Sequence, residues 1–301
     1  MTEYIDIISL GGGTQSSAMH RKAERGEFKI NGEVVIPKMS IFADPGNEPA
    51  EVYEFMEWLK ETSTVIPIIT TTAGNIIDDT LTGIRDQKNF KSAPFFVKTK
   101  EAITEPVIDT VIDENGEFQD IDRGHVVLGY KEGQGRLWRQ CTEYYKIAAI
   151  RREIRKQLGY GPRDRIKEKI RLWMGISTDE AHRMTDSNVK YIEHHYPLID
   201  ENMSRFDCIK WMVDEGFPTP PKSACIVCPY HNDDYWKRMR DNDPESFQMA
   251  IDFDKQIRNM PGIDGEVYLH RSMIPLDQVE FKLSHEQIDM FGEECSGMCG
   301  L

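Results

Sequence analysis

Three consecutive glycines, Gly11, Gly12 and Gly13, separate an apolar run at residues 5–8 from a hydroxyl-rich run at 14–17. A short β-branched run, then glycines, then small polar residues that lead into a helix-forming stretch is typical of a strand, a tight loop and a helix. Glycine lets the backbone approach an anion closely, and the first helical turn offers free N–H groups at the positive end of the helix dipole. The segment therefore predicts a phosphate-binding loop, although a plain turn is compatible with the same glycines.

The loop differs from the two commonest glycine-rich phosphate loops. A Walker A loop ends in Gly-Lys-Ser/Thr, whereas Gly13 is followed by Thr14 and Gln15, so no lysine is placed for the β- and γ-phosphates. The dinucleotide pattern G-x-G-x-x-G has its third glycine where this chain has Ser16. Neither pattern describes this loop.

Residues 11–16 resemble instead the PP-loop, S-G-G-x-D-S, of the adenine nucleotide α-hydrolase superfamily. Gly11 replaces the first serine and Gln15 replaces the aspartate, and the sulfonucleotide reductase branch of that superfamily also accepts glutamine there. The resemblance implies a loop that binds the phosphates of ATP, or of an adenylyl sulfate, together with Mg²⁺. The nucleotide-binding residues that it implies are Ser9, Gly11, Gly12, Gly13, Thr14, Gln15, Ser16, Ser17, Asp44 and Gly175.

Two further segments resemble the phosphoadenosine-phosphosulfate (PAPS) reductase-like family of that superfamily. Asp44 ends an apolar run and opens a Pro-Gly turn, as in the family's D-T-G-x-E segment, and open α/β sheets bind ligands at such strand ends. Residues 175–183 resemble the family's G-(I/L)-x-x-x-E-x-x-R segment. Glu180 and Arg183 lie three residues apart and share a helix face, so Arg183 could neutralise phosphate and Glu180 could orient it or hold Mg²⁺. A surface ion pair is the alternative interpretation.

Cysteines supply candidate chemistry in the second half of the chain. Cys225 and Cys228 form a C-x-x-C motif, which suits structural zinc, an iron–sulfur cluster or a dithiol. Cys141 begins a predicted helix, where the helix dipole lowers the pKa of a thiol. Cys208 falls in an amphipathic helix pattern and is interpreted as a buried structural thiol. His231 lacks a partner at ligand spacing and is left outside the predicted site.

Residues 139–147 resemble the R-x-C-C-x-x-x-K segment of the cluster-bearing PAPS reductase-like proteins. Thr142 replaces the second cysteine of that pair. The resemblance therefore implies a [4Fe–4S] cluster on Cys141, Cys225 and Cys228 whose fourth ligand is Cys295 or Cys299, or whose fourth iron is open to substrate, with zinc as the alternative metal. The catalytic residues taken from these segments are Arg139, Lys146, Glu180 and Arg183.

The alternation of strand and helix patterns predicts an α/β fold with a parallel sheet. The family resemblance makes this a doubly wound, mainly parallel five-stranded, HUP-like sheet. A β-hairpin around Asn115-Gly116 is predicted as an insertion at about 101–130. We expect a nucleotide-binding domain at 1–200 and a helical region with the cysteine loop at 201–301. The strand patterns lie at 4–9, 34–42, 64–70 and 170–176, and the helix patterns at 15–26, 48–61 and 142–158.

The charge distribution is uneven along the chain. The formal net charge is −14, which argues against sequence-independent clamping of a polyanion, yet residues 131–190 hold 15 Lys/Arg against 8 Asp/Glu. That basic block suits a nucleotide or a nucleic acid, or equally a solvated helix surface. No apolar run reaches the roughly 20 residues of a transmembrane helix, and a strand pattern follows Met1 closely, so we expect a cytoplasmic protein without a membrane partner.

These patterns lead to one leading hypothesis and two alternatives. The leading hypothesis is an ATP pyrophosphatase that adenylates a carbonyl substrate, with a nucleobase as the expected one, for transfer of sulfur or an amine with a bound iron–sulfur cluster. Its partners are an adenine nucleotide, a nucleobase or nucleic-acid substrate and a sulfur or amine donor, and a homodimer is compatible with the sequence. The alternatives are a sulfonucleotide (PAPS or adenylyl sulfate) reductase and a nucleotide-binding component of a DNA-modification or defence complex.

Overall fold

The structure is a computed structural model that describes residues 4–88, 90–91, 93–112 and 118–282. Its central element is a five-stranded sheet in the order β5-β4-β1-β8-β9, in which every neighbouring pair is parallel. This confirms the predicted α/β class with a parallel five-stranded sheet. The strands are β1 (Tyr4–Leu10), β4 (Met39–Asp44), β5 (Ile68–Thr72), β8 (Lys169–Met174) and β9 (Ile192–His195).

Helices cover both faces of this sheet. Successive residues of β1 point to opposite faces, so Ile8 packs with α1 (Thr14–Glu24), α2 (Ala50–Thr62) and α6 (Arg205–Asp214), whereas Ile7 packs with α4 (Ala148–Gln157). Cys208 of α6 is fully buried in the first of these layers. Its interpretation as a buried thiol is therefore confirmed, and burial raises its thiol pKa to about 12.

The predicted strand at 34–42 is wrong at its beginning. Residues 29–34 form a separate small hairpin, β2 (Lys29–Ile30) with β3 (Glu33–Val34), and β4 begins at Met39. Positive φ angles at Asn31 and Gly32 make the tight turn of this hairpin. Pro37 interrupts the run because it has no N–H to give to a ladder.

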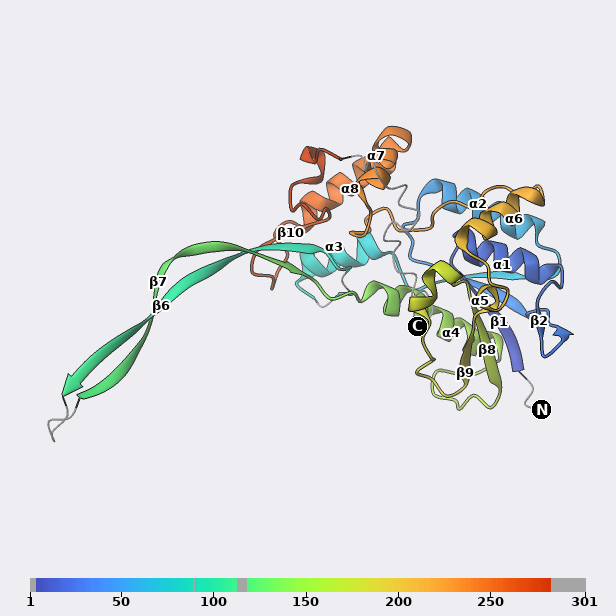
Figure 1. Cartoon of the computed structure of the whole chain (residues 1–301), viewed down its shortest axis with the longest axis horizontal. Helices are drawn as coiled ribbons and strands as arrows, with labels where there is room; N and C mark the ends of the chain where they lie inside the picture. Colours follow the sequence, from blue (N-terminus) through green and yellow to red (C-terminus); the bar gives the residue numbers. More distant parts are fainter. Residues whose placement is uncertain (1–3, 89, 92, 113–117, 283–301) are drawn as a thin grey trace.

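The inserted hairpin is longer than the predicted 101–130. Strands β6 (Phe96–Ile112) and β7 (Phe118–Arg136) pair antiparallel along their length, and β10 (Glu266–Tyr268) joins β6 at its root. Figure 1 shows the pair projecting far from one end of the molecule as a twisted ribbon. The predicted turn at Asn115-Gly116 lies outside the described residues.

A third group of helices packs around the root of the ribbon. Phe95 and Val97 are buried there against α3 (Ile76–Asp86), α7 (Asp233–Asn242) and α8 (Pro244–Ile257). In the described chain no helix is long and apolar enough to cross a membrane. The remaining short elements are η1 (Thr142–Ile147), η2 (Thr178–Arg183), α5 (Pro197–Asp200) and η3 (Leu276–Gln278).

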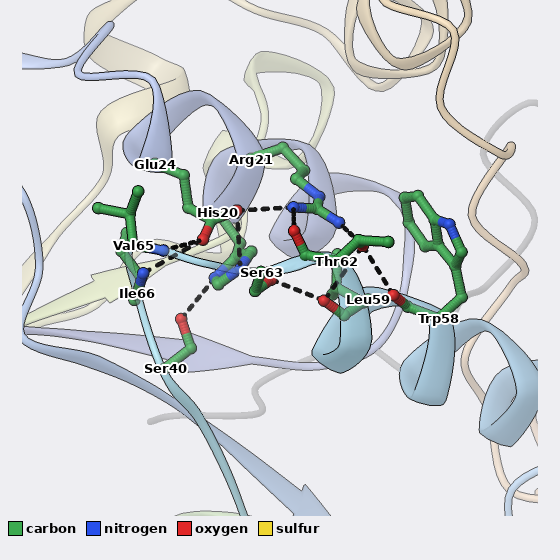
Figure 2. Close-up of polar contacts among 10 residues, drawn as sticks. All are labelled: His20, Arg21, Glu24, Ser40, Trp58, Leu59, Thr62, Ser63, Val65 and Ile66. Carbon is green, nitrogen blue, oxygen red and sulfur yellow. Dashed lines mark hydrogen bonds and ion pairs between the residues drawn. The ribbon is translucent and has the colours of Figure 1, made fainter.

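A buried polar network fixes helix α1 on the sheet (Figure 2). The His20 ring is hydrogen-bonded through Nδ1 to Ser40 Oγ and through Nε2 to Ser63 Oγ, both at 2.8 Å. Glu24 accepts the backbone N–H groups of Val65 and Ile66 at 3.1 Å. Burial lowers the pKa of His20 to about 4, so the imidazole is neutral near pH 7. The network matters for function because the amino end of this helix carries the glycine loop.

Candidate active site

The glycine loop forms a tight turn that runs directly into α1. Gly12 has a φ of +74°, a left-handed conformation that side chains rarely adopt, and Gly13 is the N-cap residue of the helix. The Gly11 N–H donates to Ser16 Oγ at 3.1 Å, and the Ser16 hydroxyl donates to the Gly13 carbonyl at 3.3 Å. The predicted order of strand, loop and helix is therefore confirmed, with Ser16 closing the turn.

Two hydroxyl groups at the amino end of α1 are buried without partners. Thr14 Oγ1 and Ser17 Oγ have no hydrogen-bond partner within the described part of the chain, and their residues are 2% and 0% exposed. Leaving a buried hydroxyl unpaired costs roughly 1–3 kcal/mol, so such groups are normally satisfied. The free backbone N–H groups of the first helical turn lie at the same end. This combination suits the oxygen atoms of an anionic ligand.

The loop after β8 packs directly on the amino end of α1. A Cβ atom added to Gly175 would lie 2.7 Å from Ser16 Cα and 2.8 Å from Ser16 N. A side chain of any kind would therefore push the helix away from the end of β8. Two residues further on, Ser177 Oγ accepts from Gln15 Nε2 at 3.5 Å. The predicted residues Gly175, Gln15 and Ser16 are thus brought together.

Asp44 lies at the carboxyl end of β4, the neighbour of β1 in the sheet. Its Oδ1 atom accepts from the Gly46 N–H at 2.7 Å and from the Tyr53 hydroxyl at 3.0 Å. Both bonds fix the carboxylate at the carboxyl end of the parallel strands. Ser9, near the end of β1, is buried between Ile41 and Met174 in the sheet register.

Glu180 and Arg183 form an ion pair on η2, with 2.5 Å between Oε1 and Nη1. Their side chains are 14% and 9% exposed, so the pair is largely buried and the surface alternative does not describe it. The Arg183 Nε atom has no hydrogen-bond partner among the described residues. The predicted shared face is present, as a 3-10 turn with non-helical backbone at Glu180.

Cys141, Cys225 and Cys228 line a single cavity, together with Arg139, Lys146 and Tyr230. The C-x-x-C motif forms a turn in which the Cys228 N–H donates to the Cys225 carbonyl at 3.0 Å. Within the described ranges, no three His, Cys, Asp or Glu side chains are grouped closely enough to hold one metal ion. Cys295 and Cys299 lie outside the described residues.

The helix after Cys141 begins differently from the prediction. A single α-helix was expected over 142–158, but Thr142–Ile147 is π-helical and α4 follows from Ala148. A π-turn widens the backbone and is common at functional sites. Thr142 Oγ1 is buried and, within the described chain, has no hydrogen-bond partner.

Residues 44–48 connect the glycine loop to the cysteine loop. The Ile226 N–H donates to the Asn47 carbonyl at 2.9 Å, and Ser223 Oγ donates to Glu48 Oε2 at 3.1 Å. Lys146 Nζ lies 3.8 Å from Glu48 Oε1. A Cβ atom on Gly13 would lie 3.5 Å from Ser223 Cβ. The segments that resemble the PP-loop and the cysteine motif therefore meet at one edge of the molecule.

His231 belongs to this site, although the sequence analysis left it out. Its Nε2 atom is 2.8 Å from the Cys225 carbonyl, which can only accept, so Nε2 carries the proton. The ring stacks on Tyr235 with centroids 3.9 Å apart. Burial lowers the His231 pKa to about 3, so the ring is neutral near pH 7 and stabilises the cysteine loop through its hydrogen bond to the Cys225 carbonyl. The sequence signal was its position three residues after Cys228.

Comparison with protein-family models finds no matching family, and comparison with curated proteins finds no matching relative.

Proposed function

We propose that this protein is a PAPS reductase-like PP-loop enzyme with a HUP-like core. In this proposal it uses ATP to adenylate a carbonyl oxygen, most simply that of a nucleobase, for transfer of sulfur. The observation that carries the proposal is the pair of unpartnered buried hydroxyls, Thr14 and Ser17, at a glycine-capped helix end. Three thiols line a cavity across the same edge of the molecule.

The nucleotide would bind with its phosphates on the glycine loop. The N–H groups of the first turn of α1 and the hydroxyls of Thr14 and Ser17 would donate to the β- and γ-phosphate oxygens. Asp44 and Glu180 would supply the carboxylate oxygens that Mg²⁺ prefers. Arg183 would neutralise charge on the pyrophosphate as it leaves. Each assignment places a group where negative charge develops during the reaction.

The proposed reaction has two steps. In the first, the substrate carbonyl oxygen attacks the α-phosphorus of ATP, the bond from that phosphorus to the bridging oxygen breaks, and pyrophosphate leaves. In the second, a sulfur nucleophile attacks the adenylated carbon, and the carbon–oxygen bond breaks as AMP leaves with the oxygen. Lys146 and Arg139, which line the thiol cavity, would hold anionic species there.

The donor set fits a sulfur-binding group. Cys141, Cys225 and Cys228 are thiols on one cavity beside two cationic side chains, and thiolates are the ligands of iron–sulfur clusters and of structural zinc. A [4Fe–4S] cluster held by these three residues would have a fourth iron open to bind the sulfur to be transferred, whereas Cys295 as the candidate fourth ligand would close that position.

Gln15 favours a second candidate, reduction of an adenylyl sulfate. A glutamine takes the place of the acidic residue of the loop, and its amide donates to Ser177 Oγ at 3.5 Å, leaving a neutral group beside the phosphate site. A neutral amide repels a sulfate less than a carboxylate does. In that reaction Cys295 would be the attacking thiol and no pyrophosphate would form.

Two parallel incubations separate these functions. The purified full chain is supplied with ATP, Mg²⁺, sulfide and single-stranded oligonucleotides, and in parallel with an adenylyl sulfate and a thiol reductant. Pyrophosphate release that depends on the oligonucleotide supports the proposal, and sulfite release supports the reductase instead. Binding of ATP without either product would contradict both and favour the nucleotide-binding component. A Ser17→Ala variant is the control for release at this loop.

A further inference from the structure

The root of the ribbon carries a tryptophan that is almost fully exposed. Trp138 is 87% exposed, the largest value among the exposed large hydrophobic side chains of the described chain. It lies between Arg136, the last residue of β7, and Cys141 of the thiol cavity. The preceding residue is fixed, because the Leu137 N–H donates to the Phe95 carbonyl at 2.9 Å. An indole this exposed, next to an anchored residue, is typical of a binding surface.

Arg136 and Arg139, which flank Trp138 in the sequence, both lie against the ring of Tyr230. The guanidinium groups of Arg136 and Arg139 lie 5.4 and 5.5 Å from the ring centroid of Tyr230. Tyr230 and Arg139 also line the thiol cavity. We name the group formed by Trp138, Arg136, Arg139 and Tyr230 the aromatic–cationic platform. It combines flat apolar rings with positive charge at the border of the thiol cavity.

Further cations lie on the ring of Tyr235 in α7. Lys222 Nζ is 5.5 Å and the Arg238 guanidinium 5.0 Å from the ring centroid of Tyr235. The chain as a whole carries a formal net charge of −14, so this gathering does not follow from composition. Arg136, Trp138 and Arg139 also lie near the start of the basic run at 131–190. The local field therefore favours a negatively charged ligand.

Rings with arginines match the chemistry of single-stranded nucleic acid. Unpaired bases stack on exposed aromatic side chains, while cationic side chains follow the phosphates. In a duplex the bases are stacked on one another, so an exposed indole gains nothing from them. We propose that the aromatic–cationic platform binds single-stranded nucleic acid, with a base stacked on Trp138 and the adjoining phosphates on Arg136 and Arg139. This inference rests on the proposed function and deepens it, because the acceptor then is a base in a single strand.

Fluorescence anisotropy tests the platform by measuring the affinity of the full chain for a fluorescein-labelled single-stranded oligonucleotide without ATP. Trp138→Ala weakens binding by about 5- to 150-fold, the range for loss of one base–aromatic stack, and Trp138→Phe restores most of it. Phe206→Ala removes another exposed aromatic ring, 64% exposed on α6, and leaves the affinity unchanged. A matched duplex binds more weakly than the single strand.

Salt dependence separates the two parts of the platform. Each phosphate contact to a single strand contributes about 0.7 to the slope of log affinity against log salt. Arg136→Gln therefore lowers the slope by about 0.7, whereas Trp138→Ala leaves it unchanged. Circular dichroism of each variant is the control for folding.

The outcomes keep this inference separate from the proposed function. Equal affinity of wild type and Trp138→Ala, a preference for duplex, or absence of oligonucleotide binding overturns the platform, and the exposed indole then belongs to a protein interface. Oligonucleotide binding that depends on Trp138, without pyrophosphate release from ATP, supports the platform and overturns only the proposed reaction. Pyrophosphate release with a free nucleobase, without oligonucleotide binding, supports the proposed reaction and overturns the platform.

Discussion

Replacing Gly175 with alanine should damage both folding and nucleotide binding. The new Cβ atom would lie 2.7 to 2.9 Å from three atoms of Ser16, two of them backbone atoms of α1. Ordinary contact begins at 3.4 Å, so the helix end must retreat by about 0.7 Å. Overpacking of this kind costs about 1–3 kcal/mol. Because hydrogen bonds to charged groups contribute about 1.5–3 kcal/mol each, loss of one from the loop weakens ATP binding about tenfold or more.

Gly11→Ala is the matched control for folding, because its Cβ atom would approach the same residue without a clash. That atom would lie 3.5 Å from Ser16 Oγ, an ordinary contact, and Gly11 does not have a positive φ. Its free energy of unfolding should be unchanged or higher by up to about 1 kcal/mol, because alanine restricts the unfolded chain.

Urea unfolding followed by circular dichroism measures the first effect, and titration calorimetry with ATP measures the second. The Gly175→Ala midpoint should fall while the Gly11→Ala midpoint does not. Equal unfolding free energies for the two variants, or full ATP affinity in Gly175→Ala, would refute the argument that α1 must sit against the end of β8.

Three other predictions address the polar network, the hydroxyls and the thiols. Because burial lowers the His20 pKa from 6.5 to about 4, His20 has no pH-linked effect above pH 6.5. Below pH 6.5 the unfolded chain binds the proton more readily than the folded chain, so the free energy of unfolding falls by up to about 3 kcal/mol by pH 4. In urea unfolding at a series of pH values, His20→Gln should make this fall smaller, and an unchanged dependence of the unfolding free energy on pH would contradict the prediction. Thr14→Val removes a buried hydroxyl that has no partner in the described chain, so it should leave the unfolding free energy unchanged or higher yet weaken ATP binding by about 1 kcal/mol, as calorimetry would show; equal ATP affinity would contradict the phosphate site. Protein purified without oxygen should contain iron and absorb at about 400 nm. The Cys225→Ser variant should lose both the iron and the absorbance, whereas Cys208→Ala, in the separate buried layer, should keep them. A colourless protein with stoichiometric zinc would exclude the cluster.

The parallel sheet could be predicted because its strands are buried on both faces. Ile7 and Ile8 are both fully buried, on opposite sides of β1, and such strands appear in the sequence as continuous apolar runs. The loop after β1 was equally clear, since its three glycines allow a conformation that other residues resist. These features depend on local sequence, which one chain displays fully.

The parts that could not be predicted depend on contacts between distant residues. No sequence pattern near Asn47 predicts that its carbonyl accepts from the Ile226 N–H. His231 joins the site through the Cys225 backbone carbonyl, and spacing between metal-ligand residues cannot reveal such a contact. The ribbon outgrew its predicted bounds because its root is anchored by β10, more than 100 residues further along the chain. The π-turn after Cys141 has no propensity signal at all. The catalytic roles of Glu180, Arg183, Lys146 and Arg139 stay predictions.

The contact between the glycine loop and the cysteine segment has a consequence for biosynthesis. Gly13 and Ser223 face each other across the site although about 210 residues separate them in the chain. At a synthesis rate of about 5–20 residues per second, roughly 10–40 s pass between emergence of the loop and emergence of the segment that closes over it. During that time Phe42 and Met56 can already pack beneath Gly12, but the glycine loop stays open to water on the side that Ser223 later covers. Because β8 and β9 also follow the glycine loop by more than 150 residues, a nascent chain completes the sheet only about 1–6 s before it completes the site.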